Sequence, residues 1–204
     1  MTVIKRGEAP FRPRARLLVL LGEQLITNEV IAVVELVKNA YDADAQNVDV
    51  ILQDVGEPAK GQIIVQDDGS GMSLETVLNV WLEPATDFRK RQREARERTP
   101  KYGRLPLGEK GIGRFAGHKL GNLVEVVTRP TDGEHEVVVS VDWQQFEQVD
   151  YLDRIPITWF TRDPEVFVDK AHGTRITITN LRKEWTPKMV DTPVSYTHLT
   201  LPTN

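Results

Sequence analysis

The stretch NEVIAVVELVKNAYD, residues 28–42, decides the fold. Its apolar side chains recur three and four residues apart, which predicts a helix packed on one side, and Asn28 is a suitable N-cap. Glu35, Asn39 and Asp42 stand at positions i, i+4 and i+7, so a carboxylate, an amide and a second carboxylate share one polar face. Such oxygens suit a hard cation such as Mg²⁺, and a carboxylate among them can orient water. An ordinary solvated helix face is the alternative interpretation.

A second polar cluster, DDGSGM, begins at Asp67 directly after the predicted strand 62–66. Gly69 and Gly71 allow the backbone to turn sharply and to approach a flat ligand closely. Asp67 can accept a hydrogen bond from an exocyclic amine such as that of adenine. The alternative is a glycine-rich turn that only connects the strand to a helix predicted at 73–82.

A third cluster, GEKGIGRFAG, covers residues 108–117 and precedes a predicted helix start. Backbone amides at such a position bind phosphate, and Lys110 or Arg114 would add positive charge. Two familiar phosphate loops are excluded: the sequence G-x-x-x-x-G-K-[ST] is absent, and the glycine spacing is one residue too long for G-x-G-x-x-G. A basic segment precedes this cluster, whereas a dinucleotide-binding unit would have a strand there.

That basic segment, residues 89–104, holds eight Lys or Arg and two Glu, although the whole chain has a formal charge of −4. Acidic and basic residues lie one helical turn apart within it, a pattern typical of a solvated helix, and Thr99-Pro100 would end the helix. A mobile basic flap over an anionic ligand also fits. A nucleic-acid patch is a further alternative, although the segment lacks interleaved aromatic residues.

The order of the predicted elements favours an α+β fold: a two-layer sandwich with helices on one face of a mixed β-sheet. A short helix is predicted at 112–120. Strands are predicted at 47–52, 62–66, 124–128, 137–141, 155–160 and 174–179.

Composition excludes several classes of protein. The chain has no Cys, so it has neither disulfides nor thiolate metal sites, which fits a reducing compartment. No apolar run approaches the length needed to cross a bilayer, and 17–21 is too short for a signal sequence. We therefore expect a cytoplasmic protein without a membrane partner. The charge balance indicates neither a nucleic-acid-binding chain overall nor an acidic disordered tail.

Four motifs occur in an order that resembles the GHKL superfamily of ATP-binding domains, which have the Bergerat-type fold. They are ELVKNAYDADA, DDGSGM, GEKGIGRFAG and HGTRITITN, and they frame roughly residues 15–182. The superfamily includes type II topoisomerases, heat-shock chaperones of the ninety-kilodalton class, histidine kinases, MutL-type proteins and MORC ATPases. The run around the third motif looks most similar to the chaperone-like and MORC-like members.

The resemblance implies ATP and Mg²⁺ as cofactors and a role for each matching residue. Glu35 would activate the hydrolytic water, Asn39 would ligate Mg²⁺, and Asp67 would bind the adenine amine. Thr174 would support Asp67, and Asp42 would lie near the nucleotide. The adenine pocket would be shaped by Gly69, Gly71 and Met72, and the phosphates would be held by Gly108, Lys110, Gly111, Ile112, Gly113, Arg114 and Phe115.

The resemblance also suggests how the chain is divided and what it does. Residues 1–14 would be an arm exchanged in an ATP-dependent homodimer, 15–182 the ATPase domain with an ATP lid at 84–107, and 183–204 a truncated linker or a non-native tail. Glu35 favours slow ATP hydrolysis that drives a conformational or dimerisation switch, with a downstream domain or protein as partner. The alternatives are a nucleotide-gated binding module with negligible turnover and a histidine-kinase catalytic domain.

Overall fold

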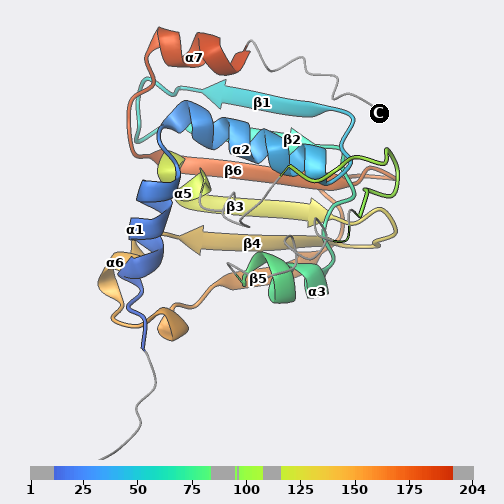
Figure 1. Cartoon of the computed structure of the whole chain (residues 1–204), viewed down its shortest axis with the longest axis horizontal. Coiled ribbons are helices and arrows are strands. Elements are labelled where there is room, and N and C mark those ends of the chain that lie inside the picture. The colour runs from blue at the N-terminus through green and yellow to red at the C-terminus, as the bar shows by residue number, and fades with distance from the viewer. Residues whose placement is uncertain (1–11, 84–94, 96, 108–115, 195–204) are drawn as a thin grey trace, which may run out of the picture.

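The computed structural model describes residues 12–83, 95, 97–107 and 116–194, and they form helices packed on one β-sheet. Figure 1 shows α2 and α3 in front of the sheet and α1 near the ends of its strands. The two-layer α+β sandwich predicted from the sequence is therefore confirmed.

The sheet has six strands in the order β1-β2-β6-β3-β4-β5. All its pairings are antiparallel, whereas the sequence predicted a mixed sheet. The reason is that β6 enters between two hairpins, β1–β2 and β3–β4, and runs antiparallel to both of its neighbours. The strands are β1 (Val48–Gln53), β2 (Gln62–Asp67), β3 (Gly121–Arg129), β4 (Glu136–Asp142), β5 (Thr158–Arg162) and β6 (Gly173–Leu181).

The longest helix, α2, has the start that the sequence predicted. The side chain of Asn28 accepts a hydrogen bond from the backbone N–H of Ile31, which caps the first turn. The helices are α1 (Arg16–Leu25), α2 (Glu29–Asp42), α3 (Leu74–Thr76), α5 (Ala116–Leu120), α6 (Gln145–Gln148) and α7 (Pro187–Val194), and a 3-10 turn spans Leu152–Arg154.

The core lies between α2 and the sheet. Val33 and Leu36 of α2 are 2% and 3% exposed, and Ile63, Val65 and Ile178 of the strands beneath are just as deeply buried. Alternate residues of a strand point to the same face, so these strand positions define the helix-covered face. Burial of one such side chain contributes about 1.5–3 kcal/mol, and this packing holds α2 against β2 and β6.

Several elements differ from the sequence-based expectation. The helix predicted at 73–82 starts as expected, because Ser73 caps it, but it continues as a π-helical turn, Val77–Trp81. There the N–H of Leu82 donates to the carbonyl of Val77 over 2.9 Å, one residue further than in an α-helix. The strand predicted at 155–160 begins only at Thr158, because Pro156 cannot donate to a strand ladder.

The two ends of the described chain also bear on the predictions. Trp185 lies beyond the predicted end of the domain, yet it is only 3% exposed and belongs to the core. The α7 helix follows it, in a segment for which no regular structure was predicted.

Most of the predicted basic helix lies outside the described residues, and residues 97–107 form neither helix nor strand. Among the described helices, no single one is long and apolar enough to cross a membrane.

Candidate functional site

Three side chains on neighbouring strands form a polar row on the helix-covered face of the sheet. Asp67, the last residue of β2, is paired with Thr174 of β6, and Thr174 is paired with Thr128 of β3. Directly opposed residues place their side chains on the same face. The backbone N–H of Thr174 donates to Oδ1 of Asp67 over 3.3 Å, and the two threonine hydroxyls lie 3.1 Å apart. We refer to Asp67, Thr174 and Thr128 as the polar row.

The Asp67 carboxyl group has one occupied oxygen. Both of its described donors, the backbone N–H groups of Gly69 and Thr174, bond to Oδ1. Within the described residues, Oδ2 therefore remains an available acceptor. Burial raises the pKa of Asp67 to about 7, because the two hydrogen bonds only partly offset the loss of hydration. A carboxyl with a raised pKa and an open acceptor is suited to bind a ligand rather than to stabilise the fold.

The fully buried Thr128 sets the hydrogen-bond directions in the row. Its hydroxyl donates to the carbonyl of Gly173 over 3.0 Å and accepts from the N–H of Met72 over 2.8 Å. Because a hydroxyl has only one proton, Thr174 must be the donor in the contact between the two threonines. The oxygen of Thr174 is then left as an acceptor beside Asp67.

The glycine turn after β2 needs glycine for steric reasons. A Cβ atom on Gly69 would lie 2.7 Å from the carbonyl oxygen of Ala43, and one on Gly71 would lie 1.9 Å from that of Arg129. Gly71 also has φ +63°, which side-chain-bearing residues rarely adopt. The N–H of Ser70 donates to the same Ala43 carbonyl over 2.7 Å. This contact joins the turn to the C-terminal end of α2.

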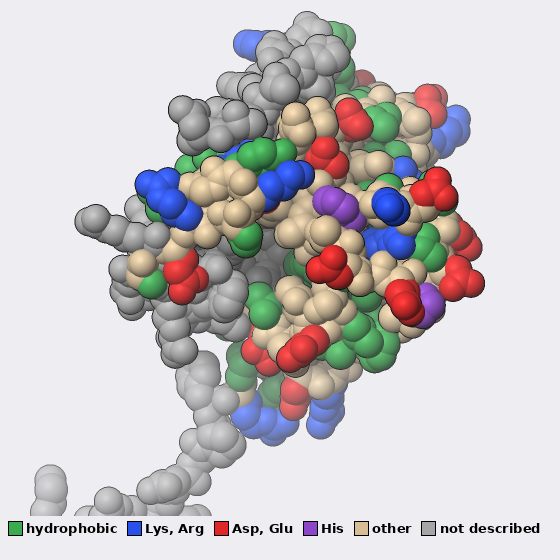
Figure 2. Space-filling model, turned by 90° about the vertical axis from the view of Figure 1, so that its right-hand side faces the viewer, with side chains coloured by type: hydrophobic (Ala, Val, Ile, Leu, Met, Phe, Trp, Pro, Cys, Tyr) green, Lys and Arg blue, Asp and Glu red, His purple; other side chains and the backbone are tan. Residues whose placement is uncertain are grey.

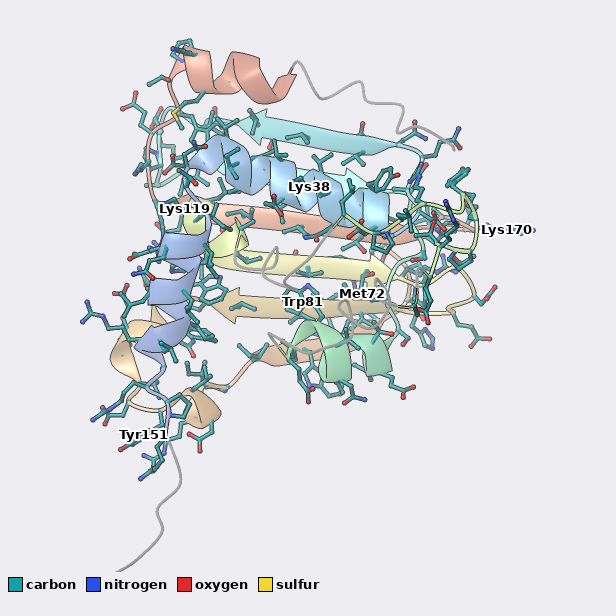
Figure 3. All side chains as sticks on the ribbon, viewed as in Figure 1. Lys38, Met72, Trp81, Lys119, Tyr151 and Lys170 are labelled. Atoms are coloured by element: carbon teal, nitrogen blue, oxygen red, sulfur yellow. The ribbon has the colours of Figure 1, made fainter. Side chains whose placement is uncertain are left out.

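The predicted polar face of α2 is present. Glu35 and Asn39 are half-buried one turn apart, and Asp42 is buried one further turn along. Oε1 of Glu35 lies 2.5 Å from Nζ of Lys38, whose label in Figure 3 lies over the middle of α2. The helix thus presents a carboxylate and an amide close to the protein surface, where a ligand can reach both.

The described part of the predicted lid is anchored to the end of α2. Oδ1 of Asp42 accepts a hydrogen bond from the backbone N–H of Leu107 over 2.7 Å. Arg104 is 1% exposed, and its Nη1 donates to the carbonyl of Ala45 over 2.6 Å. Its guanidinium lies 4.6 Å from the ring centroids of both Tyr41 and Tyr102. This end of the lid is therefore part of the packed domain.

Sequence reasoning missed three structurally important residues of this region. Thr128 appeared only as a strand residue, and Arg104 only as one charge of a basic run. Asp68 accepts hydrogen bonds from the backbone N–H groups of Gln46 and Asn47 and thereby ties the glycine turn to β1. Burial would raise the pKa of Asp68, but the bonds from Asn47 and Gln46 outweigh it and lower that pKa. No local pattern distinguishes Asp68 from Asp67.

The predicted phosphate loop lies outside the described residues. Gly108, Lys110, Gly111, Ile112, Gly113, Arg114 and Phe115 all belong to that stretch. The α5 helix follows at once, starts at Ala116 and packs against α2. The remaining predicted site residues fall into two neighbouring groups: the α2 face with Glu35, Asn39 and Asp42, and the glycine turn with the polar row.

Comparisons with known proteins agree with this arrangement. Residues 27–174 match the family model described as histidine kinase-, DNA gyrase B- and HSP90-like ATPase. The chain is also 33% identical over 119 residues to a protein of Herpetosiphon aurantiacus named putative type II restriction enzyme HgiDII. That match covers 58% of this chain and 18% of the relative. Because the family model spans most of the sheet together with α2 and the glycine turn, the chain belongs to the histidine kinase-, DNA gyrase B- and HSP90-like ATPases.

Proposed function

We propose that this domain binds ATP with Mg²⁺ and hydrolyses it slowly, and that the bound nucleotide drives a conformational or dimerisation switch. Family membership supports ATP binding and hydrolysis in general. The observation that carries the proposal for this chain is the half-buried Asp67 carboxyl, whose pKa is raised and whose Oδ2 is open among the described residues.

Adenine recognition would use the polar row. Oδ2 of Asp67 would accept from the exocyclic amine, and the Thr174 oxygen beside it could accept a second donor, directly or through water. Gly69 and Gly71 keep the backbone close to α2 and β3, where a side chain at either position would collide with a backbone carbonyl. Met72 is half-buried at the end of the turn and would pack against the base.

The metal and the water would be held by the polar face of α2. No group of three His, Cys, Asp or Glu in the described residues could hold a metal ion. This fits Mg²⁺ held by the Asn39 amide oxygen, nucleotide phosphates and waters, because Mg²⁺ keeps several waters and takes few protein ligands. Bound Mg²⁺ would neutralise phosphate charge. Glu35 would take the proton of the attacking water, and its contact with Lys38 would orient the carboxylate.

Phosphate binding would depend on the segment that follows Leu107. The bond from the N–H of Leu107 to Asp42 and the burial of Arg104 hold the residues that precede the predicted phosphate loop against α2. Gly108, Gly111 and Gly113 would then present backbone amides to the phosphates, with Lys110 and Arg114 adding charge. A lid anchored in this way could close over nucleotide and exclude water.

The chain matches only part of a larger relative, so we propose that it works beside a further domain or protein partner. Nucleotide-gated binding without appreciable turnover is the alternative. The ATP turnover of Glu35→Ala distinguishes hydrolysis from binding alone. If Glu35 is the general base, turnover should fall roughly 10²- to 10⁴-fold while ATP binding is retained.

Calorimetric titration with ATP, ADP and a non-hydrolysable ATP analogue, with and without Mg²⁺, tests the site. We expect binding by the wild type and none by Asp67→Asn, because the amide can present a donor to the adenine amine. Asp49→Asn is the matched control, since Asp49 is exposed on β1 with its side chain on the other face of the sheet. Equal ATP binding by wild type and Asp67→Asn would contradict the assignment of the adenine site.

A further inference from the structure

An apolar hollow lies away from the polar row, between α1, the π-helical turn and β4. Its volume is about 290 Å³, and its lining includes Leu18, Trp81, Trp143, Phe146 and Ile155. Val141 also lines it and pairs with Val124 of β3, four residues before Thr128 of the polar row. At about 3.3 Å per residue, the hollow is separate from the proposed adenine site.

The apolar surface continues outward from the hollow along α1. Four leucines of this ten-residue helix are 36–43% exposed, although their neighbour Leu18 faces the hollow. A helix on the surface of a monomer normally turns such residues inward. The contiguous apolar surface therefore extends beyond what a small molecule in the hollow could cover. The four are Leu17, Leu20, Leu21 and Leu25.

An arginine cluster stands at the edge of the hollow. The guanidinium carbons of Arg12, Arg14 and Arg154 lie 3.9, 4.9 and 5.5 Å from the centroid of the Tyr151 ring. Tyr151 precedes Leu152, which lines the hollow. In Figure 3 the Tyr151 label lies below α1, near the chain entering that helix, and Figure 2 shows blue side chains gathered at the same lower edge of the molecule.

The cluster carries more positive than negative charge, although two carboxylates stand beside it: Asp150 and Asp153, the latter in the lining of the hollow. Arg14 pairs with Asp150, but Arg12 and Arg154 have no ion-pair partner among the described residues. Neither does Arg16, which is exposed at the start of α1. Holding several guanidinium groups around one ring is electrostatically unfavourable. An anionic partner would relieve this repulsion, and arginine is well suited to bind carboxylates in pairs of hydrogen bonds.

We propose that this surface docks an acidic amphipathic peptide segment of a partner protein. Large apolar side chains of the segment would enter the hollow and cover the α1 leucines, while its Asp and Glu side chains would bind the arginine cluster. A nucleic-acid backbone would satisfy the arginines but leave the leucines and the hollow uncovered. A membrane surface would not fill a concave hollow. The combination of apolar hollow and cationic edge favours a peptide.

Fluorescence anisotropy with three labelled peptides tests this docking. The probe is a short helical peptide with Leu and Phe at positions i, i+3, i+4 and i+7 and Glu elsewhere. One comparison peptide has Lys in place of every Glu, and the other has Ser in place of every Leu and Phe. We expect binding of the acidic amphipathic peptide alone, and weaker binding as salt screens the arginines.

Protein variants complete the test. Arg12→Glu combined with Arg154→Glu should weaken binding of the acidic peptide by about tenfold or more, because two contacts become repulsive. Lys170→Glu is the matched control: Lys170 is exposed and lies at the opposite edge of the molecule in Figure 3. Both variants should keep the wild-type circular dichroism spectrum and ATP affinity, which separates this proposal from the proposed ATPase function.

Three results would overturn the proposal. The first is equal binding of the acidic and the Lys-containing peptides. The second is no binding of the acidic peptide to the wild-type protein. The third is that single-stranded DNA or vesicles of anionic phospholipid bind to this surface and the peptide does not. That result would assign the surface to a different class of partner.

Discussion

Two carboxyl groups on opposite faces of the sheet, the half-buried Asp67 and the fully buried Glu136, accept hydrogen bonds to very different extents. Asp67 lies under the helices, receives both of its described hydrogen bonds on one oxygen, and has a pKa raised to about 7 by burial. Glu136, at the start of β4, is fully buried on the other face. It accepts from the backbone N–H groups of Val166 and Phe167 at 2.7 and 2.5 Å and from Arg162 at 3.1 Å.

The two carboxyl groups differ in how many hydrogen bonds their oxygens accept from described donors. Burial would raise the pKa of Glu136 as well, but the bonds from Phe167, Val166 and Arg162 outweigh it and hold that pKa below its usual value. Glu136 is therefore a structural anion that joins β4 to the loop before β6. Asp67 has only two donors among the described residues, both on Oδ1, so that Oδ2 is open. The number of donors, more than burial itself, distinguishes Asp67 from Glu136.

The largest effect is expected for Glu136→Ala. This change removes three acceptor contacts and leaves two buried N–H groups and Arg162 without a carboxylate, at a cost of about 3 kcal/mol or more in the free energy of unfolding. Urea denaturation measures this loss, and calorimetry on the folded variant should find ATP affinity unchanged. A stability close to that of the wild type would remove the contrast between the two carboxyl groups.

A pH series distinguishes Asp67 from Glu136, because their contributions to the free energy of unfolding change in opposite directions with pH. Because the folded-state pKa of Asp67 is raised, its stabilising contribution is complete below the unfolded pKa of about 4 and is lost as pH rises through about 7. The Glu136 contribution is present above its usual pKa and is lost as pH falls through its lowered value.

Asp67→Asn should therefore become more stable than the wild type as pH rises. We expect a gain of about 2 kcal/mol at about pH 8, after allowing for the partial exposure of the residue, and almost none at about pH 4. Thermal or urea unfolding across this range measures the difference. A difference that does not change with pH would mean that Asp67 has an ordinary pKa.

A smaller effect is expected for Thr128→Val. The side chains have the same shape, but the N–H of Met72 and the carbonyl of Gly173 lose their hydrogen-bond partner in a buried position, which costs about 1–2 kcal/mol. The Thr174 hydroxyl also loses its acceptor, so ATP binding should weaken as well. Thr128→Ser restores the hydroxyl and should recover most of the affinity; failure of this rescue would separate the hydroxyl from nucleotide binding.

The smallest change in stability is expected for Lys38→Met. The Glu35–Lys38 pair is partly exposed and lies within one helix, so its loss should lower the free energy of unfolding by about 0.5 kcal/mol or less. If Lys38 positions the Glu35 carboxylate, ATP turnover should fall in this variant while ATP affinity stays unchanged. Unchanged turnover together with unchanged stability would leave the pair as a surface contact only.

Local patterns in the sequence were sufficient to predict much of the fold. The spacing of apolar residues predicted α2, and its Asn28 cap is present because capping depends only on neighbouring residues. Strands β1, β2 and β6 lie close to the predicted ranges, since their runs of β-branched residues contain no Pro. The strictly antiparallel sheet, the π-helical turn and the α7 helix could not be predicted, because each depends on contacts made after the chain has folded.

By itself, the sequence determined which polar residues stand together along the chain: the carboxylate and amide on one face of α2, and Asp67 with the glycines at the end of β2. Only the tertiary structure decided what surrounds Asp67. The register of β2, β6 and β3 aligns it with Thr174 and Thr128, which no local pattern links. The same is true of Glu136 and Arg104, whose burial depends on distant segments. Hydrogen bonds between distant segments act across space, and in the described residues they satisfy Glu136 while leaving Oδ2 of Asp67 open.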